Sequence, residues 1–177
     1  MANKGTRKKF SIQMITYLGM LTALEIILNR FLSINAWNIK IGFSFVPIVV
    51  AAVLFGPLAG GIVGALGDFL GAILFPIGPY FPGFTATAFV TGVIFGLFLY
   101  KKQTIPRIAG AVLINQLIFS FIVNSFWISI LYGSPFVPLL ATRIVQVIIV
   151  GAVEFIGISV VSKVAKGISL KRQIART

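Results

Sequence analysis

The sequence predicts an all-α integral membrane protein, built as one bundle of six transmembrane helices. Of its 177 residues, 58% are hydrophobic and only 10% are charged, which lies outside the range of soluble domains. Uncharged runs at 41–67, 69–100 and 108–142 are each long enough to cross about 30 Å of hydrocarbon. A spanning helix takes about 20 residues, so the sequence predicts a single membrane domain over 1–177.

Basic residues predict the topology of the bundle. Twelve of them lie in three groups, namely Lys4, Arg7, Lys8 and Lys9 before the first helix, Lys101, Lys102 and Arg107 in an internal loop, and Lys163, Lys166, Lys171, Arg172 and Arg176 near the end. By the positive-inside rule, both tails (1–9 and 166–177) and the internal loop are cytoplasmic, which requires an even number of spans. The net charge of +12 is thus assigned to topology and to anionic lipid, and no nucleic-acid partner is expected.

The order of elements follows from apolar runs and their breakers. Helices are expected at about 10–34, 43–55, 58–75, 84–100, 108–132 and 139–165. Gly56-Pro57 ends the short second helix. Three prolines and two glycines make 76–83 too irregular for a helix, so this segment is expected at an interface or beside a cavity. The segments 35–42, 101–107 and 133–138 are expected as loops.

The composition excludes many kinds of chemistry. The chain has no cysteine, no histidine and three acidic residues. Disulfides, thiol chemistry, imidazole bases and nearly all transition-metal sites are therefore excluded, and no cofactor or metal is expected. A Gly-Lys-Ser/Thr sequence is also absent, so this chain does not carry a Walker A motif of its own.

Three basic residues are not explained by the topology. Arg30, Lys40 and Arg143 are all expected toward the outer side, where intramembrane charges should face the bundle interior or water. Only Glu25 and Asp68 are expected near them as compensating anions. The surplus of positive charge predicts an anionic guest.

Polar and aromatic residues are expected at the same depth. Gln116, Ser120, Asn124 and Trp127 fall within about 80° on a helical wheel, and an aromatic group comprises Trp37, Tyr80, Phe81, Phe84, Trp127 and Tyr132. A carboxylate-bearing aromatic ligand fits these features. The alternative is that each residue makes helix-to-helix hydrogen bonds or anchors the interface. Glu154, nearer the inner end and about 20° from the face of Arg143, is expected to pair within the bundle.

Glycines predict close packing of helices. Gly60, Gly64, Gly67 and Gly71 lie within about 60° on one helix face, which lets another backbone approach closely. Gly19 and Ala23 form a small-xxx-small pair on the first helix. This pair is consistent either with internal packing or with docking of a second membrane protein.

Several motifs together resemble a known family. Gly42-Phe-Ser-Phe-Val-Pro47, Leu54-Phe-Gly-Pro-Leu-Ala-Gly60 and Gly64-Ala-Leu-Gly-Asp68 resemble the second and third helices of S components, the substrate-binding membrane subunits of energy-coupling factor (ECF) vitamin transporters. The resemblance covers nearly the whole chain. The segment Gly78-Pro-Tyr-Phe-Pro-Gly-Phe-Thr85, with Arg30 and Asn124-Ser-Phe-Trp127, is most similar to the folate-specific branch.

The resemblance implies a function and partners. A six-helix binding protein of a bacterial plasma membrane would capture a vitamin from outside and deliver it by joining a transmembrane coupling subunit (T component) and two ATPase subunits. Gly19 and Ala23 match the family's docking pattern on the first helix, although that pattern is often Ala-xxx-Ala.

With folate as the ligand, each predicted site residue has an expected role. Arg30, Lys40 and Arg143 attract the glutamate tail; Trp37, Tyr80, Phe84 and Trp127 stack on the rings; and Asn29, Asp68, Asn124 or Gln146 hydrogen-bond to the pterin edge. The nearest alternative is an S component for riboflavin, thiamine or pyridoxine. Others are a membrane enzyme acting on lipid through Glu25, Asp68 and Glu154, and a scaffold subunit without a ligand.

Overall fold

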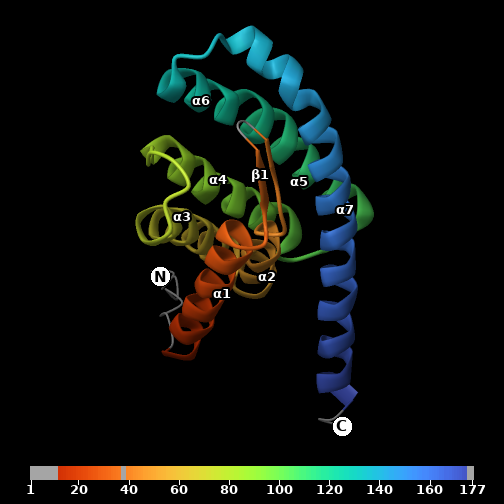
Figure 1. Ribbon diagram of the computed structural model, residues 1–177. Coiled ribbons are helices and arrows are strands. Elements are labelled where there is room, and N and C mark those ends of the chain that lie inside the picture. The colour runs from red at the N-terminus through yellow and green to blue at the C-terminus, as the bar shows by residue number, and fades with distance from the viewer. Residues whose placement is uncertain (1–11, 37–38, 175–177) are drawn as a thin grey trace, which may run out of the picture.

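The computed structural model describes residues 12–36 and 39–174, and the side chains of 12–34 and 40–163. It is a helical bundle with one short hairpin (Figure 1). The elements are α1 (Ile12–Arg30), β1 (Ile34–Ala36), β2 (Ile39–Ile41), α2 (Phe45–Phe55), α3 (Pro57–Leu74), α4 (Pro82–Leu99), α5 (Ile105–Ile114), the π-helix η1 (Asn115–Val123), α6 (Asn124–Tyr132) and α7 (Phe136–Ile174). Because α5, η1 and α6 follow one another without a break, they form one continuous helical rod.

The six predicted helices are present, counting the α5–η1–α6 rod as one. Within the described residues, five helices are long and apolar enough to cross a membrane: α1, α3, α4, the rod and α7. The sixth, α2, has 11 residues and is therefore only about 16 Å long. Gly56 ends it with φ of 102°, in the region that favours glycine, and Pro57 starts α3 at once. This breaker keeps α2 too short to span alone.

The segment 35–42, expected as a loop, was predicted wrongly. Ile34 pairs with Ile41 and Ala36 with Ile39 in an antiparallel hairpin. Isoleucines at 34, 39 and 41 favour strands because β-branched side chains pack well on a pleated surface. Polar residues lie between these isoleucines, and strands of three residues are too short to show a clear alternation of polar and apolar side chains.

Three helix boundaries also differ from the prediction. The last helix begins at Phe136 and includes Pro138, since proline is tolerated in the first helical turn, where its missing N–H is not needed. It then continues to Ile174, through most of the predicted basic tail 166–177. Lysine and arginine are good helix formers, so the end of the apolar run did not end the helix. The first helix ends at Arg30, four residues earlier than expected.

Close packing of α3 against its neighbours confirms the role of its glycines. In the fold, α3 lies against α1, α2 and α4. A Cβ added at Gly60 would touch Ala52 on α2 and the backbone of Gly92 on α4, and a Cβ at Gly92 would overlap the backbone of Gly60. The two helices therefore approach each other through glycine on both sides.

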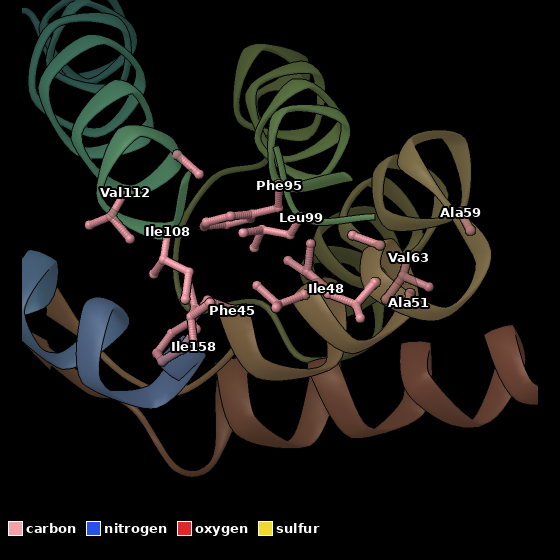
Figure 2. Close-up of a cluster of buried hydrophobic side chains, with 14 of the residues drawn as sticks. Phe45, Ile48, Ala51, Ala59, Val63, Phe95, Leu99, Ile108, Val112 and Ile158 are labelled. Carbon is pink, nitrogen blue, oxygen red and sulfur yellow. The ribbon is translucent and has the colours of Figure 1, made fainter. Parts of the chain in front are cut away.

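A hydrophobic core joins the two halves of the bundle (Figure 2). Besides Leu18 on α1, its side chains come from five further helices: Phe45, Ile48 and Ala51 on α2; Ala59 and Val63 on α3; Phe95 and Leu99 on α4; Ile108 and Val112 on α5; and Ile158 on α7. The core contacts made by α2, α4 and α5 connect α1–α4 with the rod and α7.

The hairpin stands between these two halves (Figure 1). Strand β2 packs against α7, and the Gln146 side-chain amide donates a hydrogen bond of 3.1 Å to the carbonyl oxygen of Lys40. Helix α7 extends well past the other helices at its C-terminal end (Figure 1).

Candidate binding cavity

A cavity of about 620 Å³ lies between the hairpin and helices α1 to α4 on one side and the rod and α7 on the other. Its volume is in the range of small-molecule sites. Phe45 and Ile48 belong both to its lining and to the hydrophobic core. Val112 and Ile158, also in the core, lie one helical turn beyond the lining residues Gln116 and Glu154. The core therefore closes the cavity at this end.

Nine of the eleven residues predicted to bind the ligand line this cavity. They are Asn29, Arg30, Lys40, Asp68, Tyr80, Phe84, Asn124, Arg143 and Gln146. Trp127 lies in the wall behind the lining, where its indole N–H donates to Thr87 Oγ1 at 3.1 Å and its ring centroid is 5.4 Å from that of Phe81. Trp37 lies outside the described residues.

Arg143 is a deeply buried cation, and two of its nitrogens have no partner among the described residues. Its side chain is 4% exposed, and its Nε and Nη1 atoms have no hydrogen-bond acceptor among the described residues. Arg30, by comparison, donates to the Asp68 carbonyl oxygen at 3.4 Å, although its Nε is also unpartnered. A buried guanidinium left in this condition is costly unless an anion binds it.

The neighbouring carboxylates are held mainly by neutral donors. Glu25 accepts a hydrogen bond from the Asn29 side-chain amide at 2.8 Å. Asp68 accepts one from the Thr85 hydroxyl at 2.7 Å. Neither hydrogen bond involves Arg143, so these two acids leave its charge free for a ligand.

Lys40 lies on the hairpin, outside the membrane-spanning helices. Desolvation, followed by the nearby Arg30 guanidinium, lowers the pKa of Lys40 to about 8, against the opposite effect of the Asp68 and Glu25 carboxylates. The lysine is therefore still mostly protonated at pH 7, and an anionic ligand would favour its charged form.

Many buried polar atoms of the lining residues have no partner. Among the described residues these are Glu25 Oε2, Arg30 Nε, Asn115 Nδ2 and Oδ1, Gln116 Oε1, Asn124 Oδ1, Arg143 Nε and Nη1, Gln146 Oε1 and Glu154 Oε2. Buried polar groups are nearly always hydrogen-bonded in folded proteins. The cavity is therefore suited to a ligand that carries both donors and acceptors along its length.

Sequence reasoning did not assign Asn115, Gln116 or Glu154 to the site. Glu154 lies on the same face of its helix as Arg143, and this proximity could be calculated from the sequence. Asn115 could not be found this way, because it lies about 100° from Gln116 on an α-helical wheel. In the π-helix, residues five apart are bonded neighbours, which places Asn115 on the same wall as Ser120.

Gly19 and Ala23 line a separate apolar hollow of about 440 Å³ on the exposed side of α1 and α3. Both residues are exposed. A Cβ added at Gly19 would meet no atom within 4 Å. Gly19 therefore does not pack closely against another helix within the described residues, and its expected use in docking stays a prediction.

The comparisons with known sequences agree on one family of proteins. Residues 9–166 match the family model described as the ECF-type riboflavin transporter, S component. The chain is 40% identical over 166 residues to "Folate transporter FolT" of Clostridium novyi (strain NT), covering 88% of this chain and 96% of that protein. It is 29% identical over 158 residues to "Folate transporter FolT" of Leuconostoc mesenteroides, covering 85% of this chain and 84% of that one.

Solved structures agree with the sequence comparison. The crystal structure of FolT bound with folic acid superposes with a TM-score of 0.82 at 31% identity, covering 86% of this chain and 94% of that one. A structure described as the S component of a bacterial ECF transporter superposes with a TM-score of 0.63 at 28% identity, covering 92% and 95%. With its apolar helices, the protein is a multi-pass membrane protein, and the chain belongs to the family of ECF-type transporter S components.

Proposed function

We propose that this S component binds folate in the cavity between the hairpin and α7. The single observation that supports folate most strongly is the buried guanidinium of Arg143, two of whose nitrogens have no partner among the described residues. Riboflavin, named in the family model, has an uncharged ribityl tail, whereas the glutamate tail of folate carries two carboxylates. The similarity to folate transporters over nearly the whole chain supports the same ligand. Membership of a transporter family favours transport over a lipid-modifying enzyme.

The glutamate tail would lie near the hairpin. Arg143 would bind one carboxylate, because a guanidinium can hold a carboxylate with two parallel hydrogen bonds. Arg30 and Lys40, which also line the cavity, would attract the second. This arrangement would replace the hydrogen bonds that the cations lose with water when they are buried.

The ring systems would lie along the aromatic side of the cavity. Tyr80 and Phe84 line it directly, and Trp127 supports Phe81 from behind. Trp37 is expected to join them, as the sequence predicts. Asn29, Asp68, Asn124 and Gln146 would hydrogen-bond to polar atoms of the ligand, since each has a side-chain oxygen or nitrogen on the lining.

Two segments would open and close the site. One is the hairpin, which reaches α7 through the hydrogen bond from Gln146 to the Lys40 carbonyl. The other is the irregular segment 75–81 between α3 and α4, which places Tyr80 in the lining. Movement of both away from the cavity would admit the ligand, as lids do in many binding proteins.

The transporter would be completed by partners. The chain would lie in a bacterial plasma membrane with both termini in the cytoplasm, and a T component with two ATPase subunits would supply the energy. The apolar hollow at Gly19 and Ala23 is proposed as the docking surface for the T component, because it is exposed, apolar and unfilled.

Replacing Gly19 with leucine is expected to fill this hollow and to weaken assembly with the partners while folate binding stays normal. Vesicles containing the whole transporter should then take up folate at least about tenfold more slowly, since one misplaced side chain at an interface centre costs 1–2 kcal/mol or more. Leu113→Ala, an exposed position on α5, is the control. Normal uptake by Gly19→Leu would exclude this surface from docking.

Binding should depend on the protonation of Lys40. The charged form predominates below the pKa of about 8 and is lost above it, so folate affinity should fall as pH rises, by up to about tenfold between pH 7 and pH 9. The pterin lactam also titrates in alkaline solution. Lys40→Arg separates the two effects, because arginine stays charged and should show a smaller decrease. Equal decreases in both proteins would exclude Lys40 from the site.

Titration calorimetry of the purified protein tests the proposed function. Folic acid, riboflavin, thiamine and pyridoxine are titrated into the detergent-solubilised protein under the same conditions. A strong 1:1 response to folic acid alone is expected. A strong response to another vitamin, beside no heat from folic acid, would contradict the folate assignment and leave the family assignment unchanged.

A further inference from the structure

Glu154 is a second buried ionisable residue that the proposed binding of the glutamate tail does not use. Its side chain lines the cavity and is 7% exposed. It is hydrogen-bonded to the Gln116 side chain, and its Oε2 atom has no partner among the described residues. Apolar core residues lie directly beyond it, with Ile158 fully buried one turn further along α7.

Arg143 and Glu154 lie at two ends of the same cavity. They are eleven residues apart on α7, which corresponds to about 16 Å along the helix and about 20° around it. At that separation neither can satisfy the hydrogen-bonding groups of the other. A ligand that satisfies both must be long, with an anion at one end and a pair of hydrogen-bond donors at the other.

The other two acids of the cavity are less suited to bind the donor end. Glu25 accepts from Asn29 and lies near Lys40 and Arg30, whose charges act on it. Asp68 accepts from Thr85 and lies beside Arg30 through its own carbonyl group. Both therefore belong to the cationic end of the cavity.

Asn115 and Gln116 add hydrogen-bonding capacity beside Glu154. Both are buried and line the cavity. Neither side-chain polar atom of Asn115 has a partner, and Gln116 Oε1 has none. The π-helix begins at Asn115, so consecutive residues 115 and 116 both contribute to the same wall. Together the three residues form a polar patch above the apolar core, and we call it the inner polar patch.

We propose that Glu154 is the residue that determines specificity for the pterin ring. Its carboxylate would accept hydrogen bonds from the 2-amino group and the N3–H of the ring, which are adjacent donors that match the two oxygens of a carboxylate. Asn115 and Gln116 would bind the remaining ring polar atoms. This inference rests on the proposed binding of folate and fixes its direction, with the pterin at the inner polar patch and the glutamate tail at Arg143.

A pair of ligands tests this proposal. Folic acid and its 2-desamino-2-methyl analogue differ at the group that Glu154 would bind. Wild-type protein is expected to bind folic acid at least about tenfold more tightly than the analogue, since leaving a buried acceptor unpaired is costly. In Glu154→Gln, which loses one acceptor oxygen, this ratio should fall to about threefold or less.

The outcomes separate the inference from the proposed function. Wild-type protein that binds folic acid but does not distinguish the analogue would overturn the role of Glu154, and this measurement needs no variant to fold. An equal loss of affinity for both ligands in Glu154→Gln would also overturn it, because it would mark a merely structural role. Ser162→Ala, buried on α7 outside the cavity, should keep the wild-type ratio. Absence of folic acid binding by the wild type would instead contradict the proposed function.

Discussion

Replacing Arg143 with alanine is expected to weaken folate binding by about 2 kcal/mol or more, or about 30-fold in Kd. The guanidinium is buried and lacks acceptors for two of its nitrogens, so a ligand carboxylate would gain a desolvated, charge-assisted contact there. Its removal would also leave the ligand carboxylate in a pocket with no guanidinium opposite it. Calorimetry with folic acid measures the change directly.

Arg107→Ala provides the matched control for this experiment. Arg107 lies on α5, is exposed, and donates a hydrogen bond to the Phe98 carbonyl oxygen at 3.4 Å. Its removal should leave folate affinity within about twofold, because exposed charge contacts contribute little. Equal affinities of wild type and Arg143→Ala would show that the ligand anion binds elsewhere.

Replacing Gly92 with alanine is expected to destabilise the protein by about 1–3 kcal/mol, although alanine is the better helix former. The added Cβ would overlap the backbone of Gly60 on α3, and backbone atoms cannot move aside as a flexible side chain can. Helices α3 and α4, which form one side of the cavity, would have to separate. The thermal midpoint in detergent measures this effect.

Gly19→Ala separates packing from helix propensity. Position 19 is also helical, and a Cβ there meets nothing within 4 Å, so the thermal midpoint should stay the same or rise. If Gly92→Ala were as stable as Gly19→Ala, the close approach of α3 and α4 would be contradicted.

The helices and most cavity residues could be predicted because their signals are local. Long apolar runs identify membrane helices whatever their neighbours are. A charge such as Arg143 within such a run must face the interior, because lipid cannot solvate it. Arg30 and Asp68 are also charges within apolar runs, and all three residues line the cavity.

Other features depend on tertiary contacts or on unusual backbone geometry. Strands of three residues are too short for a clear alternation, so the hairpin was missed. A π-helix has no reliable sequence pattern, and the wheel angles calculated for an α-helix concealed Asn115. Glu154 shared a face with Arg143 in the sequence, but the length of the cavity along α7 was visible only in the folded chain.

Native mass spectrometry after incubation with an equimolar mixture of folic acid, riboflavin and thiamine tests the central claim most directly. The protein in mild detergent is expected to retain one folic acid per chain and neither of the other two vitamins. A spectrum that shows riboflavin or thiamine bound in place of folic acid would contradict the account.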